Sequence, residues 1–184
     1  MTEETMFFDT DCISAFLWID NTSIITALYG TKVAIPMQVY DELQNCRGQA
    51  AVLKTRIEKM ISEGKAVLID MDTTGKEYEL YLSLAINPEG DKVLIGKGEA
   101  ACIALARERQ GILASNNLKD ISRYIDEYKL KHKTTGDILI DAYEQKLLTT
   151  EQIEEIWSDM LAKKRKIGAR SFSEYLKNAN NQER

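Results

Sequence analysis

The stretch Met6-Phe7-Phe8-Asp9-Thr10-Asp11 decides the fold, because a short apolar run here ends in a carboxylate. Consecutive apolar residues are typical of a parallel strand that is buried on both faces. Open α/β sheets bind their ligands at the carboxyl ends of such strands. We therefore expect Asp9 at the ligand-binding edge of a parallel sheet, with Asp11 as a second carboxylate nearby.

Four further short runs resemble strands, and segments with helical periodicity separate them. The expected strands cover residues 6–9, 32–35, 66–69, 112–114 and, with the least apolar pattern, 129–133. Helices are expected over residues 49–62, 74–86 and 99–109. Strands that alternate with helices predict βαβ units and a parallel sheet covered on both faces. The predicted fold class is therefore α/β, a three-layer α/β/α sandwich with a central parallel sheet.

Two glutamates are placed by the expected helices. Pro36 suits the start of a helix after the second strand, and Val39 and Leu43 share its buried face while Glu42 lies off that face. Glu99 lies at the start of an alanine-rich helix, directly after Gly98. Carboxylates that share a cleft repel each other unless protons or a cation neutralise them. The acids therefore favour a site for a hard divalent ion.

Histidine and cysteine contribute little to any metal site. The chain has one histidine, His132, and its three cysteines, Cys12, Cys46 and Cys102, are far apart in the sequence. This pattern disfavours both a disulfide framework and a zinc site built from nitrogen and sulfur ligands. Any metal is expected to be bound by oxygen.

Composition limits the domain count and the cell compartment. A chain of 184 residues with 44% hydrophobic content is long enough for one well-buried domain. No apolar stretch approaches the roughly 18 residues of a membrane helix. The N-terminus Met1-Thr2-Glu3-Glu4 lacks the basic residues that begin a signal peptide. We expect a cytoplasmic protein with no membrane association.

The net charge of −5 disfavours a protein that coats nucleic acid by bulk electrostatics. Five of the 24 basic residues nevertheless lie close together without an intervening acid, namely Lys163, Lys164, Arg165, Lys166 and Arg170. The rest of the chain, with 19 basic and 29 acidic residues, carries −10. This basic run is either an electrostatic contact for nucleic acid or a solvated helix end, where the helix dipole favours cations.

The strand pattern stops after Leu148, which predicts a division into an α/β domain, residues 1–148, and a C-terminal helical extension, residues 149–184. Thr149 and Gln152 form a capping box, and Ser171 and Glu174 form a second one. The first of these helices carries an apolar stripe of Ile153, Ile156, Trp157, Met160 and Leu161. The end of the chain, residues 178–184, is expected to be disordered.

Four motifs together resemble the PIN domain family of metal-dependent nucleases over residues 6–148. They are Asp9 on the first strand, Glu42 within Val39–Leu43, the Gly98-Glu99-Ala100-Ala101 helix start, and an apolar strand that ends at Ser115. The chain is most similar to the bacterial branch. The resemblance implies a parallel sheet between helices and an Mg²⁺ or Mn²⁺ site at Asp9, Glu99 and Glu42. It also implies an endoribonuclease that hydrolyses single-stranded or structured RNA, a class that includes toxin-type ribonucleases. A cognate inhibitor protein and a homodimer are then candidate partners.

The sequence departs from the family at the end of the fourth strand. Many members have Thr-Asp-Asp or Ser-Asp-Asp there, and this chain has Ser115-Asn116-Asn117. An amide oxygen ligates a hard cation without contributing charge, so Asn116 is expected to orient the ion or its water. Asp120, one turn later, either supplies a carboxylate to the metal or completes a helix start with Asn117.

Other candidates also keep two interpretations. Asp11 is either a metal ligand or the cap of a helix that begins near Cys12, and Glu42 is either a ligand or an ordinary exposed helix residue. Ser115 is a candidate phosphate contact, and Lys97 is either a second one or a solvated loop lysine. The missing acids leave an alternative function, a catalytically degenerate PIN-like module that binds RNA or a protein partner. A plain α/β scaffold with incidental acids is the third hypothesis.

Overall fold

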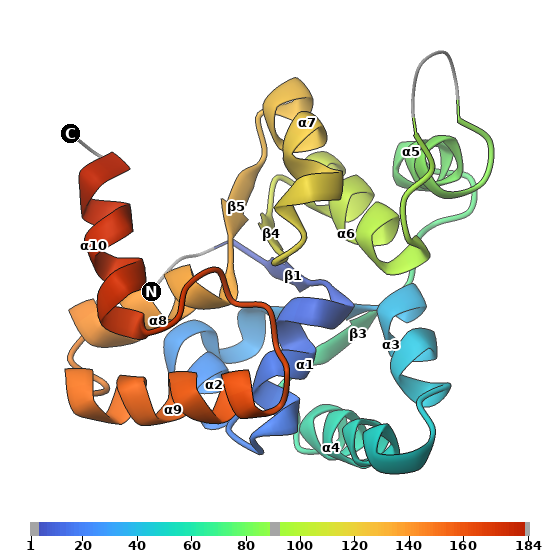
Figure 1. Ribbon diagram of the computed structural model, residues 1–184. Helices are drawn as coiled ribbons and strands as arrows, with labels where there is room; N and C mark the ends of the chain where they lie inside the picture. The colour runs from blue at the N-terminus through green and yellow to red at the C-terminus, as the bar shows by residue number, and fades with distance from the viewer. Residues whose placement is uncertain (1–3, 89–92, 183–184) are drawn as a thin grey trace.

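Five parallel strands form one sheet in the order β3-β2-β1-β4-β5 in the computed structural model, which describes residues 4–88 and 93–182 (Figure 1). The strands are β1 (Met6–Phe8), β2 (Val33–Pro36), β3 (Val67–Ile69), β4 (Ile112–Ala114) and β5 (Lys131–Lys133). All five expected strands and the predicted fold class are therefore confirmed. The strand order reverses between β1 and β4, so the switch point of the sheet lies at the end of β1.

Helices cover both faces of the sheet and form the outer layers of the sandwich. One face carries α1 (Thr10–Trp18), α2 (Ser23–Tyr29), α4 (Ala51–Ser62), α8 (Thr135–Glu144) and α9 (Thr150–Ala162). The other face carries α5 (Lys76–Ala85), α6 (Lys97–Glu108) and α7 (Leu118–Tyr128), which lie above the sheet in Figure 1. The helix α3 (Met37–Gln44) follows β2 directly, and α10 (Phe172–Gln182) ends the described chain. Short 3₁₀ turns cover Gly30–Lys32 and Gly48–Ala50.

The core lies around β1, the central strand, because all three of its side chains are fully buried. The helix α6 packs over β1 and β4 with a buried face of small side chains that includes Ala100, Ala101 and Ala104. Small side chains let a helix axis approach the sheet closely. Gly111 before β4 allows a different close approach, to the chain at the start of β1, because a Cβ atom there would lie 2.5 Å from the Thr5 carbonyl oxygen.

The C-terminal helices pack on the α/β layers. The capping box of Thr149 and Gln152 begins α9 as predicted, and Ile153, Trp157 and Met160 are buried on the stripe while Leu161 is exposed. The expected disorder from residue 178 is wrong as far as Gln182, because α10 continues to that residue. The final two residues lie outside the described part of the chain, and the division at residue 148 stays a prediction.

The tip of Tyr175 attaches α10 to the start of α8. Its hydroxyl group donates to Asp137 at 2.8 Å and lies 2.7 Å from the Thr134 hydroxyl oxygen. The ring packs directly on Gly136, where a Cβ atom would lie 2.4 Å from a ring carbon. Across residues 4–88 and 93–182, no helix is long and apolar enough to cross a membrane.

Candidate functional site

Asp9 lies where the sequence predicts, directly after β1 at the switch point of the sheet. Its backbone N–H donates to the Ala114 carbonyl oxygen at 2.9 Å, which continues the β1–β4 pairing by one residue. The side chain caps α1, since Oδ1 accepts the Thr10 N–H at 2.6 Å. Oδ2 accepts the Ser115 hydroxyl at 2.9 Å. The carboxylate is only 3% exposed, so protein groups surround it almost completely.

The environment of Asp9 opposes its negative charge. Burial and the neighbouring Glu99 raise the pKa of Asp9 from 3.8 to about 7, against the lowering effects of the Ser115 and Thr10 hydrogen bonds. Asp11 in the first turn of α1 contributes a further, smaller increase in this pKa. No cationic side chain is among the causes of this shift, so the described residues do not compensate the charge of ionised Asp9.

Glu99 is held in the first turn of α6 by two neutral donors. Oε2 accepts the Gly96 N–H at 3.1 Å, and Oε1 accepts the Asn117 side-chain amide at 2.5 Å. The same amide donates to Asp120 at 2.7 Å, so Asn117 joins two carboxylates from α6 and α7. Burial is the main cause that raises the pKa of Glu99, and Asp120 and Asp11 raise it further.

Glu42 reaches the same edge of the sheet from α3. Its Oε1 accepts the Gly98 N–H at 3.0 Å, and its Oε2 accepts the Thr10 hydroxyl. Gly98 leaves room for this approach, because a Cβ atom there would lie 3.0 Å from Oε2 of Glu42. Glu42 is an exposed helix residue, as one of its two sequence interpretations states, and it also has two hydrogen-bond partners at this edge of the sheet.

Asn116 and Ser115 differ from their predicted roles. Both polar atoms of the Asn116 side chain bind Thr135, with Nδ2 donating to the hydroxyl oxygen at 2.9 Å and Oδ1 accepting the N–H at 2.8 Å. It is Asn117, the next residue, that points to the acids. Ser115 is fully buried and its hydroxyl donates to Asp9, so it positions that carboxylate and has no surface for a phosphate contact.

The remaining candidates lie at the rim. Asp11 is exposed, and since Asp9 caps α1, the interpretation of Asp11 as the helix cap, one of its two alternatives, is wrong. Asp120 is exposed in the first turn of α7. Lys97 is exposed at the start of α6 and lines a hollow of about 430 Å³ with Glu42 and Gln38.

The basic run crosses the molecule after α9 and divides into two kinds of residue. Lys163, Lys164 and Lys166 are exposed. Arg165 is half-buried, with its guanidinium group 5.8 Å from the centre of the Trp18 ring and within 3.5 Å of the Ser14 hydroxyl oxygen. Arg165 therefore attaches the run to α1, and three lysines remain available to solvent.

The donor set fits a hard cation, because Asp9, Glu42, Glu99 and Asp120 offer only carboxylate oxygens. In the described residues no three acidic, histidine or cysteine side chains converge closely enough to surround one ion. Neutral donors hold the carboxylates instead, namely Thr10, Gly96, Gly98 and Asn117. These donors satisfy the oxygens without cancelling the charge, as the raised pKa of Asp9 shows.

A parallel sheet with carboxylates from three elements at its switch point defines an α/β protein with an acidic site at the ligand-binding edge. Comparison with protein families agrees with this geometry, since a family model described as PIN domain matches residues 5–181. The chain belongs to the PIN domain family, which confirms the resemblance and assigns it a nuclease-type fold. The match extends through α9 and most of α10. Comparisons with curated proteins and with solved structures give no significant match.

Proposed function

We propose that the protein is a metal-dependent endoribonuclease that hydrolyses phosphodiester bonds in single-stranded or structured RNA. The observation that carries the proposal is the convergence of Asp9, Glu42 and Glu99 from β1, α3 and α6 on one edge of the sheet. Membership of the PIN domain family supports divalent-metal dependence and nucleic-acid binding. A toxin-type role, an inhibitor protein, a homodimer and a cytoplasmic location stay predictions.

In this proposal Asp9 and Glu99 hold Mg²⁺ or Mn²⁺, with Glu42 and Asp120 as further acids. The ion supplies an activated water and stabilises charge on the phosphate oxygens when it is bound. Ser115 fixes the orientation of Asp9 through its hydroxyl, and Asn117 sets the spacing of Glu99 and Asp120. Backbone N–H groups at the start of α7 are available to a phosphate oxygen at a helix N-terminus.

The test is RNA cleavage by the purified protein with each metal and with a chelator. Asp9→Asn and Glu99→Gln should each lose cleavage, because each replaces a carboxylate that holds the ion. Their thermal midpoints should stay equal to that of the wild type or rise, since each removes a repelling charge. Asp126→Asn is the matched control, because Asp126 is an exposed acid near the other end of α7.

Two outcomes separate the proposal from its alternative. Metal-dependent cleavage that both site variants lack, and that the control retains, supports the nuclease. RNA that stays intact with both metals across a broad substrate panel contradicts it. If such a protein still binds RNA, the catalytically degenerate module is the better description.

A further inference from the structure

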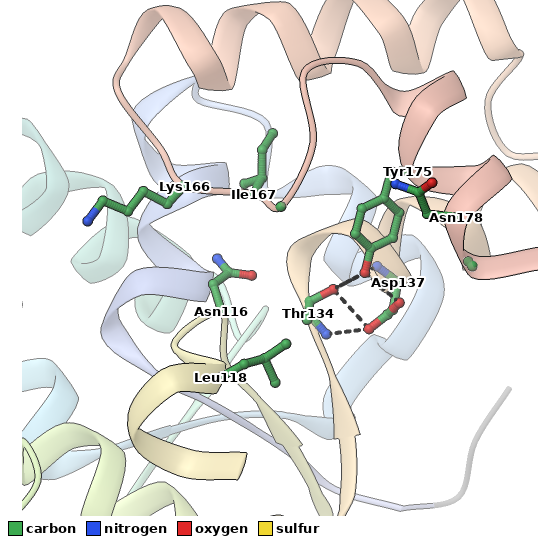
Figure 2. A pocket seen from close by; sticks show the side chains of 10 residues that line it. Asn116, Leu118, Thr134, Asp137, Lys166, Ile167, Tyr175 and Asn178 are labelled. Carbon is green, nitrogen blue, oxygen red and sulfur yellow. Dashed lines mark hydrogen bonds between the residues drawn. The ribbon is translucent and has the colours of Figure 1, made fainter. Parts of the chain in front are cut away.

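A hollow of about 290 Å³ lies beside the acidic site, and the C-terminal part of the chain forms much of its wall (Figure 2). The first residues of α7 and α8 line one side, and the loop 166–168 and α10 line the other. The hollow therefore exists only because the segment after α9 folds back over the carboxyl ends of β4 and β5.

Asn116 connects this hollow to the proposed site. Its neighbour Ser115 donates to Asp9, and its other neighbour Asn117 donates to Glu99. Asn116 itself turns the other way, to Thr135, and lines the hollow. Asn116, a residue of the wall, is thus adjacent in the chain to Ser115 and to Asn117, the two residues that bind Asp9 and Glu99. Chain connectivity therefore places this wall beside the acidic site.

The wall offers apolar surface together with polar groups that have no partner in the described chain. Leu118 is 47% exposed at the start of α7, and Ala179 of α10 adds a small partly exposed apolar surface, while Ile167 is almost fully buried behind the wall. Among the described residues, the side chains of Asn178 and Lys166 make no hydrogen bond or ion pair. An exposed leucine on one side of the hollow and a free amide on the other make a suitable surface for a flat, polar-edged ligand.

Charge also favours a nucleotide. The one carboxylate in the wall, Asp137, already accepts bonds from the Thr134 N–H, the Thr134 hydroxyl and the Tyr175 hydroxyl. Lys163 and Lys164, the other two exposed lysines of the basic run, lie in the same segment as Lys166, on a protein that elsewhere carries −10. A polyanion with unpaired bases matches this combination better than a protein segment does.

We propose that this hollow binds one unpaired nucleobase of the RNA strand, next to the phosphate at the acidic site. Asn178 contacts the hydrogen-bonding edge of the base, Leu118 covers its face, and Lys166 contacts the backbone. The volume is at the lower end of the roughly 300–1,000 Å³ typical of small-molecule pockets, which suits a single base. The inference rests on the proposed function, since it assigns a substrate position at the same site.

The test measures binding of short single-stranded RNA by fluorescence anisotropy in chelator, where metal-dependent cleavage is absent. Asn178→Ala should weaken binding about tenfold, as expected for losing an amide contact to a base edge. Asn180→Ala is the matched control, because Asn180 is exposed on the same helix and does not line the hollow. Leu118→Ala should weaken binding several-fold. Leu147→Ala, which is 44% exposed between α8 and α9, is its control.

A series of RNAs with one abasic nucleotide at each position identifies the bound base. For the wild type, an abasic nucleotide at one position should weaken binding about tenfold relative to the intact RNA. For Asn178→Ala, the abasic and intact RNAs should bind with nearly equal affinity. Thermal midpoints equal to that of the wild type confirm that the variants fold.

The inference is overturned if both pocket variants bind RNA as tightly as their controls, or if the wild type does not bind single-stranded RNA. It is also overturned if no abasic position weakens binding more than the others. A protein that shows the expected losses but never cleaves RNA refutes only the nuclease proposal. A protein that cleaves RNA with unchanged pocket variants refutes only the base-binding pocket.

Discussion

Replacing Asp9 by asparagine should flatten the dependence of stability on pH. The pKa of Asp9 is raised from 3.8 to about 7 in the folded chain, mainly by burial and then by Glu99. A raised carboxyl pKa means that folding favours the protonated form. The resulting stability is fully present below the unfolded-state pKa and is lost as the pH rises through about 7. In the variant this contribution is absent at every pH.

The linkage relation gives the size of the effect. Between about pH 5 and pH 8, ionisation of the Asp9 carboxyl should lower the free energy of unfolding of the wild type by on the order of 3 kcal/mol. For a chain of this size that corresponds to roughly 6–12 °C in the thermal midpoint. Asparagine keeps the local geometry, because its carbonyl oxygen can accept the Thr10 N–H and its amide can donate to the Ser115 hydroxyl oxygen.

The assay is thermal unfolding of wild type, Asp9→Asn and the Asp126→Asn control in chelator across this pH range. The wild type and Asp9→Asn have all other titrating groups in common. The difference between their curves of thermal midpoint against pH therefore reports on Asp9 alone. As the pH rises, the thermal midpoint of Asp9→Asn should increase relative to that of the wild type. The midpoint of the Asp126→Asn control should change with pH as that of the wild type does. Parallel curves for wild type and Asp9→Asn would refute the argument, because they would mean that Asp9 is ionised in the folded chain throughout.

Three further predictions concern fold, metal and RNA. Arg109→Ala should destabilise the protein by about 2 kcal/mol in urea unfolding, because Arg109 binds both carboxylate oxygens of the buried Glu77 and is itself partly exposed; an unchanged midpoint would contradict this role. Asn117→Asp should tighten Mn²⁺ binding in calorimetric titration and Asn116→Asp should not, because only Asn117 faces the acids; the reverse order would return Asn116 to the ion. Replacing Lys163, Lys164 and Lys166 by Gln should reduce the salt slope of RNA affinity by roughly 2, at about 0.7 per phosphate contact on a single strand; an unchanged slope would place these lysines away from RNA.

The sheet was predictable because four of its strands are short apolar runs. The fifth, β5, is Lys131-His132-Lys133, an edge strand without an apolar pattern, so its sequence indicates it least. The helix α8 had an overlooked signal, the capping box of Thr134 and Asp137. The helix expected after Ser171 also had a signal for its continuation past residue 178, since Ala179 extends the i, i+3, i+4, i+7 spacing of Phe172, Tyr175 and Leu176.

The sequence was enough to place the acidic side chains of the candidate site, but it was not enough to place the amide side chains. Asp9 is placed by the strand that it ends, and Glu99 by the helix that it opens, so periodicity is enough for both. Which of Asn116 and Asn117 faces the acids depends on the backbone direction after β4, about which periodicity carries no information. The donors Thr10 and Gly98 were equally out of reach, because their partner Glu42 is distant in the sequence.

The order of the strands also has a consequence for synthesis of the chain. The strand β1 is made first and lies at the centre, but its neighbour β4 is made long afterwards, and Asp9 and Ser115 are 106 positions apart. Contacts this distant form late and slowly during folding. A ribosome must therefore release residues beyond Asn117 before Asp9, Glu99 and their positioning groups can come together. The acidic site is therefore not assembled during most of the translation of the chain.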